Sequence, residues 1–438
     1  MRLLSAVIGM VVLAWGWGMW ANGAGGGSTP WVIYEQALLL SGLLSIALMS
    51  VAMVLATRPV LLERPLGGMD RIYRVHKWSG MLAVGFAALH WLIEMSDDLV
   101  KSLAGRAGRL HEIEFSGLIK NLRDAGEEVG EFAIYLVLAM LVLSLWRRFP
   151  YRWWRPLHKA MPALYLLLAF HAAVLAPLGY WRQPVGWVLA LLLASGTTAA
   201  FLSLAGRIGR DNRAGGVVES ISTPAPDVTE VVCRLEHGWP GHRAGQFAFV
   251  SFDRFEGAHP FTIASADHGD RRLSFLIKGL GDYTRGLSRR ISKGQAVTVE
   301  GPYGCFDLDR GDGNARQIWI AGGIGVTPFM AWLDRLRSDP VRAPAARLHY
   351  CTRNAAADPL IERLASMCVD LPSISLQVHD ASQGEYLSAE QIISADEGND
   401  RAEIWFCGPR GLGESLRSRL GALLGSRLRF HQEAFELR

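Results

Sequence analysis

Six long apolar segments in the first half of the chain constrain its fold more than any other feature. They span residues 3–20, 31–56, 78–95, 132–146, 160–181 and 184–205. A helix needs about 20 apolar residues to cross the roughly 30 Å hydrocarbon core of a bilayer. Flanking residues can extend 132–146, which is short. Residues 3–20 fit either a cleaved signal peptide or a retained helix, and their length favours the helix. The sequence therefore predicts an integral membrane protein with six helices.

The charged residues between these segments predict their orientation. Residues 57–77 carry five basic side chains and two acids, and residues 147–159 carry five basic side chains and no acid. The loop 94–131 carries nine acids and five bases. Basic loops stay on the cytoplasmic side. We therefore expect both termini and the polar C-terminal half in the cytoplasm, in a protein of the bacterial inner-membrane or plasma-membrane type.

Four histidines lie in or at the ends of two of the apolar segments. They are His76 and His90 on the third segment, and His158 and His171 on the fifth. A lone histidine there can simply bond a neighbouring helix, but ionisable residues in membrane segments are functional candidates. Both spacings, 14 and 13 residues, correspond to about 20 Å of helix rise. This predicts an inner pair, His76 with His158, and an outer pair, His90 with His171, at two depths. Imidazole is an axial ligand of haem iron, so the pairs are candidate ligands of two haems.

The 13-residue spacing predicts an irregular helix near His158. A 14-residue step returns to nearly the same helix face, about 40° away, whereas a 13-residue step lands about 140° away. Pro162 lacks the amide that would bond the carbonyl of His158. We therefore expect the chain at His158–Pro162 to bend or leave regular helix, so that His158 turns inward. A regular helix with His158 facing lipid would contradict the inner pair.

Cysteine spacing and net charge exclude two classes of function. The five cysteines all lie after residue 230 and form no CxxC pair, which excludes a plant-type ferredoxin centre. A disulfide framework does not fit a cytosolic half. The formal charge of +4 gives no indication of nucleic-acid binding.

The polar half changes from strands alone to alternating strands and helices. Short alternating runs at 228–235, 247–252, 273–278 and 296–300 predict a small antiparallel barrel. From residue 316, strands at 317–321, 348–353, 374–380 and 403–407 alternate with helices from Thr327, near 359–367 and after Gly413. That alternation is typical of a parallel-sheet nucleotide-binding fold.

Three segments of this half have the composition of cofactor-binding sites. The run Ala321–Pro328 is rich in glycine, follows a strand and precedes a helix, as a pyrophosphate site requires. The run 259–265, His-Pro-Phe-Thr-Ile-Ala-Ser, offers an aromatic face and hydroxyls for a flavin ring. The run 278–284 offers Lys278 and Thr284 to a diphosphate. Each could be an ordinary turn by itself, but their order along one chain favours a flavin and nucleotide reductase.

With these motifs the polar half resembles the ferredoxin–NADP reductase superfamily, and the whole chain resembles its NADPH oxidase and ferric reductase branch. Soluble members carry an Arg-x-Tyr-Ser/Thr motif where this chain has His-Pro-Phe-Thr, and the histidine form indicates the membrane branch. The resemblance implies a transmembrane haem-binding domain at 1–210, an FAD-binding β-barrel at 216–312 and an NAD(P)-binding α/β domain at 313–438.

The resemblance also assigns site residues. The haem ligands are the four histidines above. The flavin contacts are His259, Pro260, Phe261, Thr262, Ser265, Lys278, Gly281 and Thr284. The nucleotide contacts are Gly322, Gly323, Gly325, Thr327, Pro328, Gly408 and Pro409. Cys407 lies near the nicotinamide, and Phe435 stacks on the flavin and acts as a gate. Arg353 contacts the 2′-phosphate of NADPH, because a guanidinium suits phosphate, or is an ordinary solvated arginine.

The implied activity is electron transfer from cytosolic NADPH, or NADH, through FAD and two b-type haems to an acceptor across the bilayer. Dioxygen, giving superoxide, is the favoured acceptor, with a ferric chelate as the alternative. Two rival interpretations remain open: a haem-free flavin reductase anchored by its helices, and a membrane subunit that supplies electrons to a partner enzyme.

Overall fold

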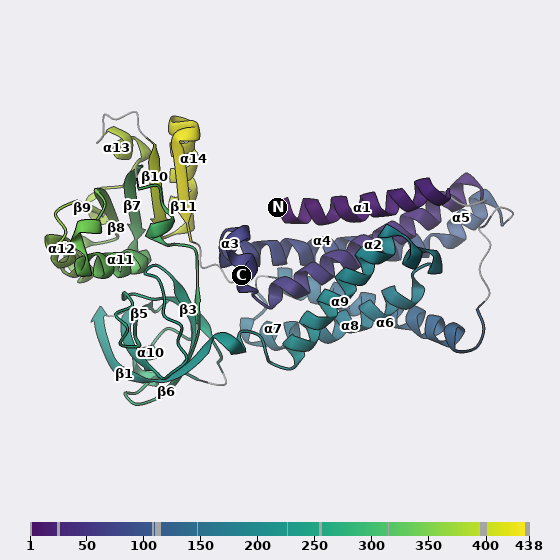
Figure 1. Cartoon of the computed structure of the whole chain (residues 1–438), viewed down its shortest axis with the longest axis horizontal. Coiled ribbons are helices and arrows are strands. Elements are labelled where there is room, and N and C mark those ends of the chain that lie inside the picture. The colour runs from purple at the N-terminus through teal and green to yellow at the C-terminus, as the bar shows by residue number, and fades with distance from the viewer. Residues whose placement is uncertain are drawn as a thin grey trace. The chain divides into compact units, whose positions relative to one another are not determined.

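The computed structural model describes residues 2–23, 27–106, 109, 115–146, 148–225, 227–253, 256–313, 315–394 and 401–433. The chain forms two compact units (Figure 1). The first comprises Met1–Leu62 and Arg71–Ile208, and the second comprises Glu63–Asp70 and Gly209–Arg438.

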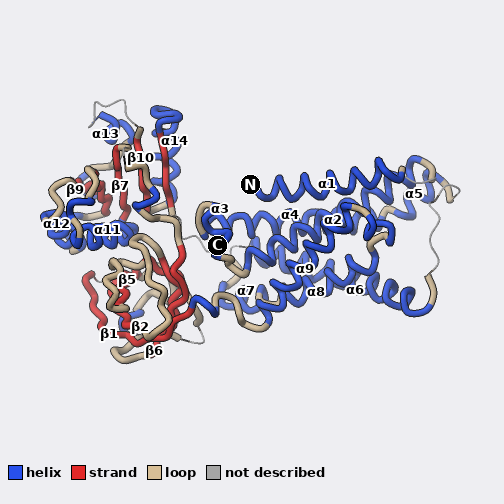
Figure 2. Tube along the Cα trace, viewed as in Figure 1, coloured by secondary structure: helices blue, strands red, loops and turns tan. Residues whose placement is uncertain are grey.

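The first unit is helical, as Figure 2 shows. Among the described residues, six segments are long and apolar enough to cross a membrane, as predicted. They are α1 (Arg2–Asn22), α2 (Thr29–Ala56), α4 (Met69–Met95), α6 (Gly117–Leu145), α7 (Tyr151–His158) with α8 (Met161–Leu175), and α9 (Pro184–Leu204). Two short helices, α3 (Val60–Leu66) and α5 (Asp97–Ala104), lie between them in sequence.

Two of the long helices extend further than their apolar segments. Helix α4 begins at Met69 and α6 begins at Gly117, where the apolar pattern alone predicts starts at 78 and 132. Hydropathy detects only the part of a helix inside the hydrocarbon, so polar first turns escape it. In α6, Arg123 donates hydrogen bonds to the carbonyl oxygens of Val174 and Leu175 at the end of α8 (2.8 and 3.4 Å). The polar start of α6 therefore caps the end of a neighbouring helix.

Helices α2 and α4 are joined by hydrogen bonds at seven-residue intervals. The imidazole of His90 bonds the carbonyl of Leu38, the Ser45 hydroxyl donates to the carbonyl of Ala83, and the imidazole of His76 bonds the carbonyl of Ala52. Each step forward along α2 matches an equal step back along α4, so the helices are antiparallel. Seven residues are close to two turns, so the bonds lie along one stripe of each helix.

The second unit begins with an antiparallel sheet in the order β4-β3-β6-β1-β2-β5. Its strands are β1 (Arg213–Ala225), β2 (Val228–Leu235), β3 (Phe247–Ser251), β4 (His259–Thr262), β5 (Arg272–Lys278) and β6 (Ala296–Tyr303), with a short helix α10 (Leu287–Arg290). A bridge between Ile263 and Phe275 connects the two edges of the sheet. The antiparallel sheet is as predicted, and its closure into a barrel stays a prediction.

The rest of the second unit is a parallel sheet in the order β11-β10-β7-β8-β9. Its elements are β7 (Arg316–Gly322), α11 (Thr327–Ser338), β8 (Ala346–Thr352), α12 (Leu360–Val369), β9 (Ile374–Asp380), α13 (Ala389–Ser394), β10 (Ala402–Cys407), α14 (Arg410–Leu424) and β11 (Leu428–Gln432). Trp319 and Trp405 pack on one face with α11, whereas Ile320 and Phe406 pack on the other with α14. The predicted strands 317–321 and 403–407 thus correspond to β7 and β10, which are covered on both faces.

Candidate functional site

The predicted histidine pairs come together in the first unit. His76 and His90 lie on α4, His158 ends α7, and His171 lies on α8. The ring centres of His76 and His158 are 6.2 Å apart, with planes at 83°. Those of His90 and His171 are 6.3 Å apart, with planes at 89°. The two pairs therefore have closely matched geometry. They lie at two levels along the helices, as the spacings of 14 and 13 residues predict.

Backbone carbonyls of neighbouring helices hold three of the four imidazoles. The Nδ1 atom of His76 lies 2.9 Å from the carbonyl oxygen of Ala52, and that of His90 lies 2.9 Å from Leu38, both on α2. The Nδ1 atom of His171 lies 2.8 Å from the carbonyl oxygen of Gly126 on α6. A carbonyl oxygen can only accept, so Nδ1 must carry the proton in each ring. Nε2 is then the nitrogen left free to bind a metal.

The fourth imidazole, His158, is held differently. Helix α7 ends at His158 and α8 begins at Met161, so the predicted break before Pro162 is confirmed. The ring stacks on Trp154, with ring centres 4.7 Å apart and planes at 17°. The indole of Trp154 donates to the hydroxyl of Ser144 on α6 (3.0 Å). Nδ1 of His158 is buried and has no hydrogen-bond partner in the part of the chain that the structure describes.

The spacing of both pairs fits a metal ion bound between two imidazoles. Metal–nitrogen bonds of about 2 Å on opposite sides of one ion, with each ring centre roughly 1 Å further away, place the ring centres about 6 Å apart. Gly80, on α4 between the two levels, is partly buried, yet an added Cβ would meet nothing within 4 Å. The spacing of the two imidazole pairs and the gap at Gly80 are features that a haem held at each pair would require.

The flavin motif forms strand β4 of the second unit. His259 stacks on Tyr283, with ring centres 4.2 Å apart and planes at 12°. Phe261 is partly buried. Burial raises the pKa of Tyr283 to about 12, which keeps this phenol neutral. The structure therefore brings the runs 259–262 and 278–284 together, and Tyr283 is a contact that the motif alone did not identify.

The diphosphate motif is a compact turn after β5. The hydroxyl of Thr284 accepts from the amides of Leu280 and Gly281 (3.0 and 3.1 Å). Lys278 lies 3.4 Å from the carboxylate of Asp227. Ser265, on the neighbouring segment, accepts from the amide of Ser274 at 3.2 Å. The predicted contacts of this motif are thus close together, and an approaching phosphate would compete with Asp227 for Lys278.

The glycine-rich nucleotide loop packs directly on the turn after β10. A Cβ added at Gly322 would lie 2.5 Å from Cδ of Pro409, and one added at Gly408 would lie 2.9 Å from the amide nitrogen of Gly322. A Cβ at Gly325 would collide with the carbonyl of Cys407. These glycines are required because the two backbones touch. Two segments predicted separately therefore form one site at the carboxyl ends of adjacent parallel strands, where such folds bind nucleotides.

The remaining predicted residues differ in their burial. Thr327 begins α11, is buried, and donates to the carbonyl of Ile324 (2.6 Å), and Arg353 is exposed just after β8. Cys407 is buried, and burial raises the pKa of its thiol, so it is neutral at pH 7. Phe435 lies outside the described residues. Glu433, which the motifs did not identify, is only 7% exposed, and burial raises its carboxyl pKa well above the usual value.

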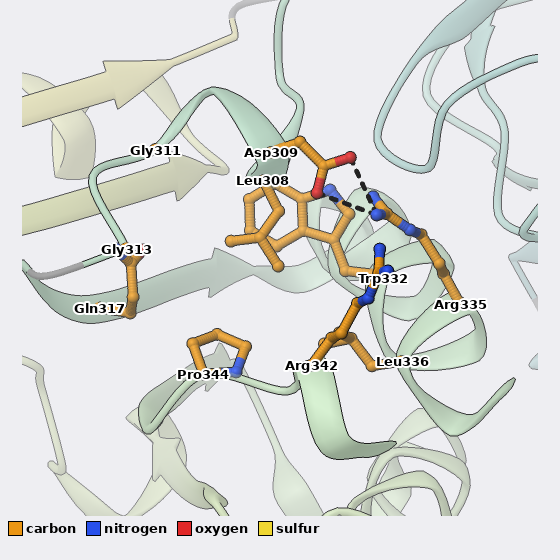
Figure 3. Close-up of a pocket in the computed structure, with 10 residues that line it drawn as sticks. All are labelled: Leu308, Asp309, Gly311, Gly313, Gln317, Trp332, Arg335, Leu336, Arg342 and Pro344. Carbon is orange, nitrogen blue, oxygen red and sulfur yellow. Dashed lines mark hydrogen bonds and ion pairs between the residues drawn. The ribbon is translucent and has the colours of Figure 1, made fainter. Parts of the chain in front are cut away.

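A cavity of about 220 Å³ lies away from this site (Figure 3). Gln317, at the start of β7, and Trp332, on α11, line it, whereas the nucleotide loop follows the other end of β7. Of its two arginines, Arg335 is ion-paired to Asp309 at 2.8 Å and Arg342 to Asp339 at 3.1 Å. The cavity therefore lies at the amino-terminal end of β7. None of its lining residues belongs to the predicted cofactor sites.

Two protein families match this arrangement along the chain. Residues 41–169 match the ferric reductase like transmembrane component, and residues 218–306 match an FAD-binding domain. The chain therefore combines a ferric reductase like transmembrane component with an FAD-binding domain. The first match contains all four paired histidines, and the second contains both predicted flavin motifs, 259–265 and 278–284.

The curated proteins similar to this chain include a ferric reduction oxidase and a respiratory burst oxidase homolog. Ferric reduction oxidase 8, mitochondrial, of Arabidopsis thaliana is 37% identical over 92 residues, which are 18% of this chain and 12% of that protein. Respiratory burst oxidase homolog protein E of the same plant is 26% identical over 211 residues, 41% of this chain and 21% of that protein. The carnitine monooxygenase reductase subunit of Escherichia coli (strain K12) is 28% identical over 189 residues, 41% of this chain and 54% of that protein.

Among the first curated relatives, the matched part spans about half of the relative's length or less. A solved structure with a likeness over most of the chain is the flavohemoglobin from Malassezia yamatoensis with bound FAD and heme. It has a TM-score of 0.50 and 16% identity, and the likeness covers 93% of this chain and 99% of that one. At this level of identity the likeness concerns the fold alone.

Proposed function

We propose that this protein moves electrons from cytosolic NADPH, through FAD and two b-type haems, to dioxygen on the opposite side of the membrane, where superoxide forms. The observation that carries the proposal is the geometry of the two histidine pairs. Both draw one ligand from α4 and one from the α7–α8 segment, and both have ring centres just over 6 Å apart. Two metal sites along one pair of helices provide a route across the bilayer.

Each cofactor has its proposed holders in the chain. The inner haem would be held by His76 and His158, and the outer haem by His90 and His171. The flavin would lie against β4 and the turn 278–284, with Phe435 as its terminal aromatic cover. The nucleotide would lie on the loop 322–328 and the turn Cys407–Pro409, with Arg353 at the 2′-phosphate. We propose the domain boundaries 1–210, 216–312 and 313–438 for these three parts.

The cofactors supply the redox chemistry: FAD, when bound, takes a hydride from NADPH and releases single electrons, which haem iron can carry. The chain itself binds, orients and excludes water. The neutral thiol of Cys407 leaves the nicotinamide position uncharged. The glycines at 322, 325 and 408 let the nucleotide approach the backbone closely. No side chain has to act as an acid or a base.

The orientation follows from the charges of the loops. The basic loops 57–77 and 147–159 would lie in the cytoplasm, so the inner pair would be the one nearer the flavin. The acidic loop 94–131 would lie outside, beside the outer pair. We propose that the protein resides in a bacterial inner membrane or a plasma membrane with both termini inside.

Purified full-length protein in nanodiscs tests the proposal. A reduced spectrum should show bis-imidazole haem, and NADPH with oxygen should give superoxide, measured as cytochrome c reduction that superoxide dismutase abolishes. The balanced reaction converts one NADPH and two dioxygen molecules into NADP⁺, two superoxide ions and one proton. A preparation that holds flavin but no haem would contradict the proposal and leave a membrane-anchored flavin reductase.

A ferric chelate is the second candidate acceptor. It is supported by the family matched at 41–169 and by the likeness to ferric reduction oxidase 8. The same preparation distinguishes it: NADPH and ferric citrate without oxygen should give ferrous iron, trapped by ferrozine, faster than superoxide forms in air.

The relatives named as reductase subunits favour a third candidate, an electron-supplying subunit. This interpretation predicts that the haems are reduced by NADPH, but that neither superoxide nor ferrous iron forms until a partner enzyme is added.

A further inference from the structure

The two histidines of the outer pair rest on the same local arrangement in two different helices. On α2, Leu38 supplies the carbonyl that accepts from His90, and Gly42 follows four residues later. On α6, Gly126 supplies the carbonyl that accepts from His171, and Gly130 follows four residues later. In a helix, residues four apart lie one above the other on the same face. Each imidazole therefore lies over a carbonyl and beside the glycine one turn further along.

Neither glycine position has room for a side chain while the imidazole stays in place. A Cβ added at Gly42 would lie 3.1 Å from both Nδ1 and Cε1 of His90. A Cβ added at Gly130 would overlap the same two atoms of His171. Nδ1 is the atom that carries the hydrogen bond, so a methyl group at either position would push on the bond that orients the ring. The overlap is larger at Gly130 than at Gly42.

The inner pair lacks this arrangement. The carbonyl that accepts from His76 belongs to Ala52, and the residue four positions later is Ala56. His158 stacks on Trp154, and its Nδ1 has no hydrogen-bond partner among the described residues. A glycine beside the ring is therefore specific to the outer pair.

We propose that Gly42 and Gly130 are positioning residues of the outer haem site. Each glycine lets an imidazole lie close enough to a helix for Nδ1–H to bond a backbone carbonyl, which fixes the tautomer and directs Nε2 to the metal. Such a bond also makes the ligating nitrogen more basic. This inference rests on the proposed function, because it assumes that the outer pair ligates a haem.

Alanine substitutions test the proposal in the full-length protein. Gly130→Ala and Gly42→Ala each add one methyl group, and alanine raises helix propensity over glycine, so weaker helix formation cannot explain a loss. The matched control is Gly85→Ala on α4, five residues from His90, where an added Cβ meets nothing within 4 Å and the residue is exposed. His90→Leu and His76→Leu identify which spectroscopic signal belongs to the outer and which to the inner site.

The measurements are the haem-to-flavin ratio, the electron paramagnetic resonance spectrum of the oxidised haems and their reduction midpoints. We expect Gly130→Ala to weaken retention of the outer haem about 10–100-fold, the range for lost support of a metal ligand, and Gly42→Ala to shift the outer signal by less. The inner signal and the flavin content should not change, and Gly85→Ala should match the wild type.

The possible results distinguish failure of the glycine positioning role from failure of the proposed electron-transfer function. If the wild type holds two haems and both glycine variants leave the outer signal and its midpoint unchanged, the positioning role is wrong and the proposed function stands. Equal changes in both signals would also contradict it, because the role is specific to the outer pair. Wild-type protein without haem overturns the proposed function and this inference together. If Gly130→Ala does not retain flavin, the outer signal of Gly42→Ala decides.

Discussion

The outer and inner histidine pairs have the same spacing but are held by different means. Both outer histidines lie within continuous helices and bond backbone carbonyls, beside glycines. In the inner pair only His76 has such a bond, and His158 depends on a stack with Trp154 at the end of a helix. The outer site is therefore built from backbone atoms that no substitution removes directly, whereas half of the inner site is built from side chains. The comparison shows that two histidine pairs with the same ring spacing can be held by different groups: backbone carbonyls at the outer pair, and partly an aromatic side chain at the inner pair.

Removing a ligand should have the largest effect on the two sites. His90→Leu should eliminate the outer haem and reduce electron transfer to the external acceptor by at least about 100-fold, more than the loss of a ligand's support costs. Reduction of the flavin by NADPH and the inner haem signal should persist. The haem-to-flavin ratio and stopped-flow flavin absorbance measure both. Loss of both haem signals would mean that the sites are not independent, and the comparison would fail.

Low pH would interfere with these tests by destabilising the second unit, which contains the predicted flavin and nucleotide sites. Burial, aided by neighbouring His379 and Arg347, lowers the pKa of His349 to about 4. The imidazole of His349 binds a proton near pH 6.5 in the unfolded chain, but only near pH 4 in the folded unit. The contribution of His349 to the free energy of unfolding is therefore largest above pH 6.5. It decreases as the pH falls, by about 2 kcal/mol between pH 7 and 5.

This pH dependence can be measured by denaturant unfolding followed by flavin fluorescence. His349→Leu should flatten the dependence between pH 7 and 5, because the titrating ring is gone. A variant whose stability falls with acid as steeply as that of the wild type would show that another group is responsible.

Trp154→Ala should affect the inner pair alone. Loss of the stacked indole leaves His158 without its observed support, so retention of the inner haem should weaken by about 10-fold. The inner resonance signal should change while the outer one does not. Trp154→Phe should have an intermediate effect, and Trp153→Ala, at a neighbouring exposed tryptophan, should have none. An unchanged inner signal in Trp154→Ala would remove the distinction between the two pairs.

Ser144→Ala should give the smallest effect. It removes the hydroxyl that accepts from the indole of Trp154, and one hydrogen bond contributes about 1 kcal/mol net. Only part of this loss reaches His158, so we expect a change of a few-fold at most in inner-haem retention. Ser195→Ala, whose hydroxyl bonds a carbonyl within α9, is the matched control. An effect larger than that of Trp154→Ala would mean that Ser144 acts by another route.

Sequence periodicity was sufficient to predict where the histidines meet. The steps of 14 and 13 residues are properties of single helices, and Pro162 indicated the break that lets the second step work. The support of each ligand could not be predicted in the same way. Gly42 and Gly130 matter only because α2 lies against α4 and α6 lies against α8, and no pattern within one helix reports its neighbour.

The strands show a similar limit. Strand β2 and strand β9 were predicted with their observed ends. In β9 the apolar residues Ile374, Leu376 and Val378 alternate with polar ones, which is the pattern of a strand. Strand β1 was missed, although it is central to its sheet. Its glycine pair, Gly215 and Gly216, together with two serines and one threonine, resembles a linker in composition. A Cβ at Gly216 would lie 2.5 Å from the carbonyl of Arg234, so close strand packing explains this glycine.

The seven-residue ladder between α2 and α4 has a consequence for how this half of the chain can change length. Helix α2 carries no ligand, yet it supplies the acceptor for one histidine of each pair. One residue inserted into α4 between His76 and His90 would rotate the latter by about 100° away from Leu38 and leave the former in place. Only insertions of seven residues in both α2 and α4 would keep all three hydrogen bonds between these helices aligned. The spacing of the two histidines along α4 is therefore matched by the spacing of their acceptors along α2, so we expect a deletion in α2 to misalign the histidines as a deletion in α4 would.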